Sequence, residues 1–343
     1  MYSIETQSEA FRDILRIVGR GKKLQRDLTY DEAFRAMQLL LGDDISEAQI
    51  GAFLVTMRVK EETADEIRGF AHGARTLMQS MPAPSVPDLV DVGLPYDGKA
   101  VNLQTGVPAL WIVAAAGVPV LLHAADHIPA KNGVTALSLL RAMGYPADMK
   151  PDDVSRTIER TNFGVLNIEH VLPQWTRLTP LRHHFGVRTL MNTAEKLLNP
   201  ANAPRHISGF YHGAYLRRLA PSLPGTTANW IVQGEEGSID IRPGKKTRVY
   251  RQTGEDMVEM EVNAADYPGY DVVQPLESPN DPQFHAGSIQ AALNGDNEAA
   301  TAQIILTAAT LLWMLDAAAD LPAGLDLARE LWESGRAKAV LNI

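Results

Sequence analysis

Apolar residues recur at helical spacing through the first 78 residues of the chain. Residues 8–18 carry one such apolar face. Thr29 and Thr63 are each followed three residues later by Glu, which is the capping-box pattern of a helix N-terminus. Ser46 is a capping residue of the same kind and precedes a further apolar face. The pattern predicts a small helical subdomain over residues 1–80.

The pattern changes after Pro82, Pro84 and Pro87, which form a stiff linker. Short apolar runs then alternate with helical segments, as in an α/β domain. Strands are predicted at residues 89–92, 118–122, 163–168, 206–211, 230–233, 248–251 and 257–262, and helices at 134–143, 151–160, 214–219, 299–315 and 325–334. The predicted fold class is α/β. The helical subdomain, joined by helices from about 178 to 200, lies beside a larger domain of residues 88–177 and 201–343 with a central mixed sheet.

One stretch, from Asp91 to Gly133, has the order of a ligand-binding α/β unit. A strand runs into a Gly/Pro turn at residues 93–98, Asn102 is placed to cap the following helix, and a second strand leads into a polar loop that begins at His123. In an open α/β sheet such loops lie at the carboxyl ends of the strands, where helix N-termini present free N–H groups to anions. The stretch therefore predicts the scaffold of a phosphate site.

The side chains on this scaffold differ from those of an ordinary phosphate cradle. Such a loop uses Gly for close approach of the backbone, and hydroxyl groups or cations to balance the charge of the ligand. Leu94, Pro95 and Tyr96 stand where small residues are expected, and Leu122 and Asp126 stand where cations are expected. We therefore expect a cleft that presents these five side chains and binds a highly charged ligand weakly.

Five motifs in this part of the chain resemble those of the anthranilate phosphoribosyltransferases, within the nucleoside phosphorylase-like glycosyltransferase superfamily. The family motifs are G-T-G-G-D, N-I-S-T, K-H-G-N-R, S-S-x-x-G and a later D-E pair. The matching segments are residues 93–97, 102–105, 122–126, 129–133 and 239–240. The resemblance makes the following residues equivalents of the family's diphosphate loop: Gly93, Asp97, Gly98, Asn102, Thr105, His123, Lys131 and Gly133. It extends from about Leu28 to Lys338 and implies the nucleoside phosphorylase or phosphoribosyltransferase-like fold.

The resemblance also implies an acceptor site, a metal site and a dimer. Arg182, in a block similar to the family's R-x-x-L-G-x-R-T-x-F-N, aligns with the arginine that faces anthranilate. Asp240 retains one carboxylate of the magnesium pair while Ile239 replaces the other, which leaves Glu236 as the local candidate for a second ligand. Magnesium is expected only if the phosphoribosyl diphosphate site is functional, and no other cofactor is indicated. The family resemblance implies a homodimer through the helical part, with the apolar faces of residues 33–57 at the interface.

Composition excludes several classes of function. The 343-residue chain has no Cys, which rules out disulfides, thiolate metal sites and a Cys nucleophile. A G-x-S-x-G motif is absent, which argues against a hydrolase. There is neither a signal-peptide pattern nor an apolar stretch of the roughly 18 to 20 residues that span a bilayer. We expect a cytoplasmic protein without a membrane partner.

A basic segment is the second candidate for ligand binding. The net charge of −9 disfavours attraction of nucleic acid by the molecule as a whole. Arg20, Lys22, Lys23 and Arg26 nevertheless lie close together among glycines and form either a solvated connection between helices or an arm that contacts phosphates. A divergent branch of the family, described as nucleic-acid binding, carries a similar Gly-Arg-Gly-Lys segment. Single- or double-stranded nucleic acid is therefore a candidate partner.

Two functions remain open. In the first, the chain has kept the fold and the dimer, has a degenerate site for phosphoribosyl diphosphate and magnesium, is not the enzyme of tryptophan biosynthesis, and binds nucleic acid or another anion. In the second, it is an active phosphoribosyltransferase that transfers phosphoribose to anthranilate or a related aromatic acceptor. The second function would require Lys99, Lys131 or backbone amides to replace the missing donors.

Overall fold

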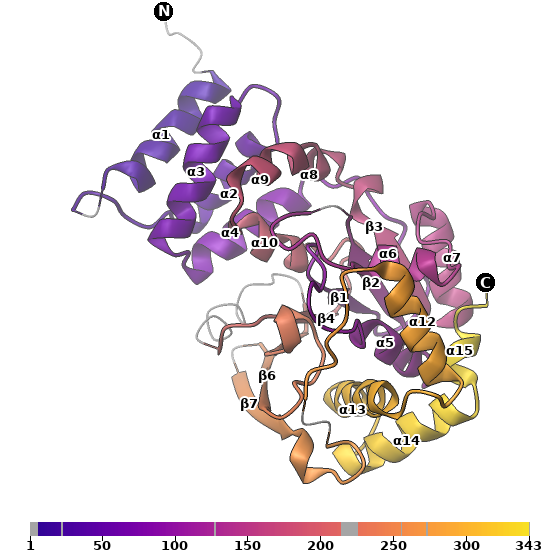
Figure 1. The fold of residues 1–343 in the computed structure, drawn as a ribbon. Coiled ribbons are helices and arrows are strands. Elements are labelled where there is room, and N and C mark those ends of the chain that lie inside the picture. Colours follow the sequence, from indigo (N-terminus) through magenta and orange to yellow (C-terminus); the bar gives the residue numbers. More distant parts are fainter. Residues whose placement is uncertain are drawn as a thin grey trace, which may run out of the picture.

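The computed structural model describes residues 6–21, 23–126, 128–213, 226–254, 256–271 and 274–342. It contains a helical domain and an α/β domain with a central mixed sheet (Figure 1), which confirms the predicted fold class. The helix predicted at residues 214–219 and the basic residue Lys22 lie outside the described residues.

The helical domain is built from two separate parts of the chain. Its first helices are α1 (Gln7–Gly19), α2 (Tyr30–Leu40), α3 (Glu47–Lys60) and α4 (Ala64–Arg75), and the later ones are α8 (Pro173–Arg177), α9 (Thr179–Phe185), α10 (Met191–Ala194) and the 3-10 turn η2 (Glu195–Leu197). Capping boxes at Thr6, Thr29, Ser46 and Thr63 start the first four helices, as the sequence predicts for Thr29 and Thr63. α9 and α10 pack against α3 and α4 (Figure 1).

The α/β domain is organised on one seven-stranded sheet with the order β3-β2-β1-β4-β5-β6-β7. The strands are β1 (Val90–Gly93), β2 (Val120–Ala124), β3 (Phe163–Asn167), β4 (Arg205–Gly209), β5 (Ala228–Val232), β6 (Lys246–Thr253) and β7 (Asp256–Asn263). The first five are parallel, with Val92 opposite Leu122 and Ile207, and β6 and β7 form an antiparallel hairpin. β1 to β5 are buried almost throughout, as strands covered on both faces should be.

Helices cover this sheet. They are α5 (Gly106–Ala115), α6 (Ala136–Ala142), α7 (Pro151–Thr161), α12 (Pro282–Leu293), α13 (Glu298–Met314), α14 (Leu321–Glu333) and α15 (Arg336–Ala339). α5 packs against α13, α14 and α15, and α12 packs against α6 (Figure 1). Within the described residues, no helix combines the length and the apolar character that a membrane span requires.

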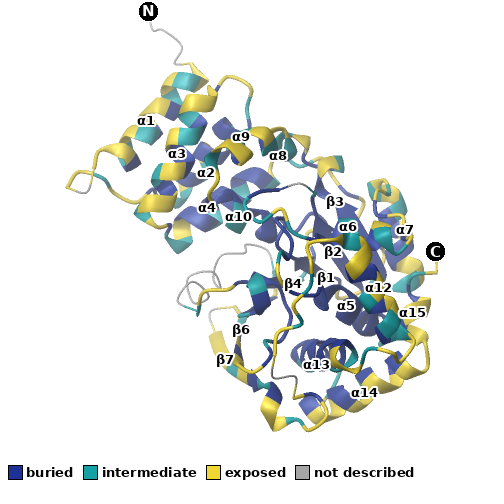
Figure 2. Ribbon diagram, in the orientation of Figure 1, coloured by how far each residue is buried: buried dark blue, intermediate teal, exposed yellow. Residues whose placement is uncertain are grey.

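Two clusters of buried apolar side chains hold the molecule together. Figure 2 shows how far each residue along the ribbon is buried. One cluster surrounds α5 and α13, and the other fills the helical domain. The second cluster continues into the sheet through Tyr96, Leu121 and Leu166. The two domains therefore share a packed core on one face of the sheet. This core fixes the position of the loops that follow the strands.

The apolar residues of α3 are used inside the helical domain. Ile50, Phe53 and Met57 are buried in its own core, so they do not form the exposed dimer surface expected for residues 33–57. Val55 and Val59 are the large apolar side chains that α3 leaves exposed, at 40% and 78% of their maximal area.

Candidate functional site

The carboxyl ends of four neighbouring strands, β2, β1, β4 and β5, bring the predicted loops to one edge of the sheet. Gly93, at the end of β1, is required by packing, because a Cβ atom there would lie 1.9 Å from the carbonyl oxygen of Lys196. This glycine matches the family motif, but the close approach that it permits is to η2 of the chain itself.

Two of the predicted loops pair with each other. Lys99 and Val134 form an antiparallel bridge with N–O distances of 3.0 and 2.7 Å. The Gly133 N–H donates to the Asp97 carbonyl at 2.8 Å, and Gly98 has a φ of +69° that suits glycine. The structure therefore brings the diphosphate-loop equivalents of residues 97–105 and 131–133 together.

The backbone amides of this loop are engaged by a carboxylate of the chain. Glu236 accepts hydrogen bonds from the N–H groups of Ala100, Val101 and Asn102 at 3.0, 3.2 and 2.9 Å, and from the Asn102 side chain at 3.1 Å. Lys131 Nζ lies 3.5 Å from the same carboxylate. Burial opposes ionisation, but the amides and Lys131 outweigh it and hold the pKa of Glu236 below its usual value. Three successive N–H groups thus form an anion site that Glu236 fills.

The predicted cap of α5 is wrong. Asn102 directs its side chain to Glu236, and α5 begins after Thr105, whose side chain makes no capping hydrogen bond. The Thr105 hydroxyl donates instead to Asp240 Oδ1 at 2.6 Å.

A buried lysine lies between two acidic residues at the second loop. Lys99 Nζ lies 2.9 Å from Asp240 Oδ2 and 3.2 Å from Glu235 Oε2, and donates to the Leu103 carbonyl at 2.8 Å. Burial alone would lower the pKa of Lys99, but the two carboxylates outweigh it and raise this pKa. Lys99 is therefore charged and is not available to an external diphosphate.

The acidic residues are arranged differently from the predicted metal pair. Asp240 accepts from Thr105 and Ser238 and shares Lys99 with Glu235. Glu236 contacts the amides of residues 100–102 instead, so Asp240 and Glu236 have no described partner in common. Across the described part of the chain, no group of three or more His, Cys, Asp and Glu side chains could hold a metal ion. Magnesium does not fit this arrangement, because the ammonium group of Lys99 already lies between the carboxylates of Asp240 and Glu235.

Most of the five side chains that were expected to face a ligand do not do so, which corrects the sequence-based expectation. Leu94, Tyr96 and Leu122 are buried in the core, and Asp126 accepts from Thr135 at 2.5 Å. Only Pro95 among the five lines the cleft between the domains.

Tyr96 and His123 belong to a buried polar chain behind the loop. The Tyr96 hydroxyl is hydrogen-bonded to His123 Nδ1 at 2.6 Å, and Asp91 Oδ2 lies 3.3 Å from His123 Nε2 and 2.6 Å from His206 Nδ1. All four side chains are inaccessible to solvent. His123, a diphosphate-loop equivalent, is therefore committed to internal partners.

The acceptor-site equivalent is also paired inside the protein. Arg182 is 2% exposed, and its Nη2 lies 2.9 Å from Glu195 Oε2. Burial raises the pKa of Glu195. Arg182 is not among the residues that line the cleft.

A cleft of about 130 Å³ separates the helical domain from the loops of the α/β domain. Its lining contains basic, acidic and aromatic side chains: Arg58, Glu62, Pro95, Asp97, Arg188, Thr189, Asn192, Thr193, Lys196, Phe210, Tyr211, His212, Glu236 and Gly237.

Two cations of the cleft already have partners. Arg188 donates twice to Asp97 Oδ2, from Nε at 2.8 Å and from Nη2 at 2.7 Å. Lys196 donates to the Gly209 carbonyl at 2.7 Å and lies 3.3 Å from the centre of the Phe210 ring. Burial lowers the pKa of Lys196 well below its usual value. A sequence motif could identify Arg188. The lowered pKa of Lys196 depends on burial, which only the fold reveals.

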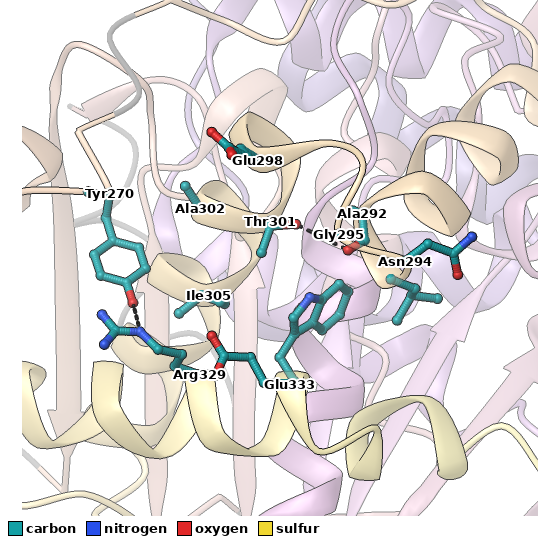
Figure 3. A pocket seen from close by; sticks show the side chains of 13 residues that line it. Tyr270, Ala292, Asn294, Gly295, Glu298, Thr301, Ala302, Ile305, Arg329 and Glu333 are labelled. Atoms are coloured by element: carbon teal, nitrogen blue, oxygen red, sulfur yellow. Dashed lines mark hydrogen bonds between the residues drawn. The ribbon is translucent and has the colours of Figure 1, made fainter.

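A second cavity, of about 550 Å³, is lined by residues between 269 and 333. None of the predicted site residues lines it. Figure 3 shows Arg329 of α14 donating to the Tyr270 hydroxyl, at 2.8 Å, on one wall, with Glu298 and Thr301 of α13 on another.

The basic segment follows α1 and is largely exposed. Arg20, Lys23 and Arg26 are all exposed, and Arg26 is in addition held by Glu32 through two hydrogen bonds of 2.6 and 2.7 Å. Lys22 lies outside the described residues. The predicted nucleic-acid contacts that the structure describes are therefore all exposed, and one of them, Arg26, is paired with a surface carboxylate.

Comparison with known proteins identifies the family. The model of the glycosyl transferase family helical bundle domain matches residues 12–78, and the model of the a/b domain of that family matches residues 96–338. The anthranilate phosphoribosyltransferase of Azorhizobium caulinodans is 31% identical over 97% of this chain and 95% of its own length. That of Rhodopseudomonas palustris (strain TIE-1) is 30% identical over 97% of this chain and 96% of its own length.

Solved structures agree at the level of the fold. Anthranilate phosphoribosyltransferase from Thermus thermophilus superposes with a TM-score of 0.82 at 24% identity, over 97% of both chains. The enzyme from Saccharomyces cerevisiae in complex with PRPP and Mg gives a TM-score of 0.79 at 18% identity, over 98% of this chain and 97% of that one. None of these similarities bears on a nucleic-acid-binding branch. With both domains matched, the chain belongs to the glycosyl transferase family that joins a helical bundle domain to an a/b domain.

Proposed function

We propose that this chain is a family member that binds nucleic acid through its basic segment and does not bind phosphoribosyl diphosphate with magnesium. The observation that carries the proposal is the position of Glu236. Its carboxylate accepts from three successive backbone amides at residues 100–102. A diphosphate at these amides would have to displace a partly buried carboxylate that is tethered to the same protein.

The charges around this loop support the same conclusion. Lys99 and Arg182 are each buried against carboxylates, Lys99 with Asp240 and Arg182 with Glu195. Withdrawing either cation toward a ligand would leave a buried carboxylate without its partner, which costs more than an exposed pair does. The site therefore offers a diphosphate few free donors.

The basic segment supplies the positive part of the proposal. Arg20 and Lys23 are exposed beside Gly19 and Gly21, so a phosphate backbone can approach them closely. The contact would be electrostatic and largely independent of sequence, because contacts to phosphates carry no sequence information. Contacts to phosphates make affinity fall steeply with salt.

Fluorescence anisotropy with labelled single-stranded DNA tests this contact. Arg20, Lys22 and Lys23, at a slope of about 0.7 for each single-strand contact, predict at least roughly 20-fold weaker binding between about 50 and about 200 mM salt. Arg26 adds less to this slope because Glu32 already pairs with it. Lys22→Glu with Lys23→Glu should abolish binding. The matched control, Lys245→Glu with Lys338→Glu, makes the same change in net charge at exposed positions of the α/β domain and should retain most of the affinity. Equal losses in both variants, or no binding at low salt, would contradict the proposal.

We also propose a homodimer formed through the helical domain. Val55 and Val59 lie one helical turn apart on α3, and both are exposed. They are the large apolar side chains that α3 can offer to a second copy. Sedimentation at micromolar concentration should give a dimer that Val55→Glu with Val59→Glu dissociates; a wild-type monomer would exclude it.

Phosphoribosyl transfer to anthranilate or a related aromatic acceptor is the second candidate function. The relatives named above favour it more strongly than they favour nucleic-acid binding, because the identity of about 30% extends over 97% of the chain. In such a transfer the acceptor amine would attack the anomeric carbon of the ribose. The bond from that carbon to the diphosphate oxygen would break, and the amine would lose a proton.

A direct assay separates the two candidates. Purified protein is incubated with anthranilate, phosphoribosyl diphosphate and Mg²⁺, and anthranilate fluorescence is followed while the product is identified by chromatography. We expect no turnover above the protein-free control. Turnover that Asp97→Ala abolishes would establish the transferase and exclude the first candidate, since Asp97 lines the cleft and orients Arg188.

A further inference from the structure

The surroundings of Lys99 resemble a cation site in which the cation is part of the chain. Its Nζ has three oxygen neighbours, from Asp240 at 2.9 Å, Glu235 at 3.2 Å and the Leu103 carbonyl at 2.8 Å. Carboxylate and carbonyl oxygens are also the ligands that hard divalent cations prefer. The Lys99 side chain is fully buried, so this ammonium does not exchange with solvent ions.

Asp240 is the residue that aligns with the magnesium-binding pair of the family. Its oxygens are both engaged, Oδ1 by Thr105 at 2.6 Å and Oδ2 by Lys99 and Ser238. The backbone of Gly106 also crowds it, because a Cβ there would lie 3.0 Å from Oδ1. A divalent ion could bind Asp240 Oδ2 only by displacing the fully buried Lys99 ammonium.

We propose that Lys99 acts as a tethered ammonium in place of a divalent cation, and that the protein therefore binds no divalent cation at Asp240 and Glu235. This inference does not depend on which ligand the protein binds, because it concerns only the charge that balances the two carboxylates. It has a direct consequence: removal of the ammonium group should create a site for a divalent cation.

Titration with Mn²⁺, followed by the paramagnetic resonance signal of the free ion, tests the inference on the full-length chain. Wild type should show no site that Asp240→Asn removes. Lys99→Met should bind one Mn²⁺ at least about tenfold more tightly than wild type, because two carboxylates and a carbonyl oxygen are left without a cation. Lys99→Met with Asp240→Asn should lose the new site. Lys131→Met is the matched control, since Lys131 is the neighbouring lysine outside this oxygen cluster, and it should gain nothing.

The other outcomes are also decisive. A wild-type Mn²⁺ site that Asp240→Asn abolishes would overturn the inference, and so would a folded Lys99→Met protein that gains no site. If Lys99→Met does not fold in metal-free buffer, it is refolded with and without Mn²⁺. Recovery only with Mn²⁺ supports the inference, and equal failure in both buffers overturns it. These readouts use neither DNA nor phosphoribosyl diphosphate, so a failed function assay leaves them unaffected.

Discussion

The junction of loops 97–105, 131–133 and 235–240 at the sheet edge and the basic segment after α1 both contain cations, but they use them in opposite ways. At the junction, Lys99 is inaccessible and lies against Asp240 and Glu235. In the basic segment, Arg20 and Lys23 are exposed. A buried charge depends strongly on its partner, whereas an exposed charge is stabilised by water.

This difference indicates where ligands can act. At the junction, a ligand must compete with partners that the fold has already supplied. In the basic segment, a ligand competes only with water and salt ions. The comparison therefore predicts large effects on stability at the junction and effects mainly on binding at the segment.

The largest effect is expected for Asp240→Ala. This change leaves the buried Lys99 with Glu235 as its remaining carboxylate and removes the acceptor of Thr105. Breaking one side of a buried pair costs about 3 to 5 kcal/mol, so the free energy of unfolding in urea should fall by about that amount.

An exposed pair provides the control for this change. Glu261 lies 2.6 Å from Lys246 on the outer strands, with both side chains well exposed, and Glu261→Ala should leave the unfolding midpoint nearly unchanged. Similar losses for the two variants would show that the junction is solvated, which would remove the basis of the comparison.

The sequence was sufficient for features that depend on local spacing. The capping boxes at Thr29 and Thr63 and the strands predicted at residues 248–251 and 257–262 appear where they were predicted, because caps and alternation are set within a few residues. The central mixed sheet was also predicted, but its strand order was not.

The partners of the buried polar groups were not predictable in the same way. Lys99 and Glu235 are 136 residues apart in the sequence, and their contact requires β1 and β5 to be placed on either side of β4. The cap assigned to Asn102 was wrong for the same reason, since its side chain is directed to Glu236, which is 134 residues away. Local patterns therefore identified the loops, but not the distant residues that pair with their polar groups.

The second prediction concerns acid unfolding. Burial opposes ionisation of Asp91, but His123 and His206 hold its pKa at about 2, below its usual value of 3.8. The group thus adds stability that is fully present above about pH 4 and is lost as the pH falls through about 2. At about 1.4 kcal/mol for each pKa unit, the contribution is on the order of 2 kcal/mol. Asp91→Asn should flatten the decline in unfolding free energy between about pH 4 and pH 2.

Glu32 sharpens this second test. The hydrogen bonds from Arg26 lower the pKa of Glu32 to about 2 as well, yet that ion pair lies at the surface. Solvent screening reduces its worth, so Glu32→Gln should change the acid limb less than Asp91→Asn does. An equal or larger effect of Glu32→Gln would contradict the ranking of buried over exposed pairs.

The third prediction is that Glu236→Gln weakens the junction and opens its anion site. The amide side chain can accept with only one oxygen, so stability should fall by about 1 to 2 kcal/mol through the loss of charge-assisted hydrogen bonds to residues 100–102. Pyrophosphate should then raise the melting temperature of the variant more than that of wild type. Glu261→Gln is the control, and an identical response of wild type and Glu236→Gln would mean that the three amides are not an anion site.

The smallest effect on stability, and the finest test of the comparison, is expected within the basic segment. Arg26 donates twice to Glu32, whereas Lys23 is exposed, so the two cations should not contribute equally to binding. Lys23→Ala should lower the slope of log affinity for single-stranded DNA against log salt by about 0.7, the value for one lost phosphate contact. Arg26→Ala should lower the slope less, because its guanidinium is already neutralised by Glu32, and should cost below about 1 kcal/mol of stability.

Glu32→Gln should release Arg26 and restore its full contribution to the slope. If Arg26→Ala and Lys23→Ala reduce the slope equally in the presence of Glu32, nucleic acid displaces this carboxylate, and surface pairing does not limit the segment.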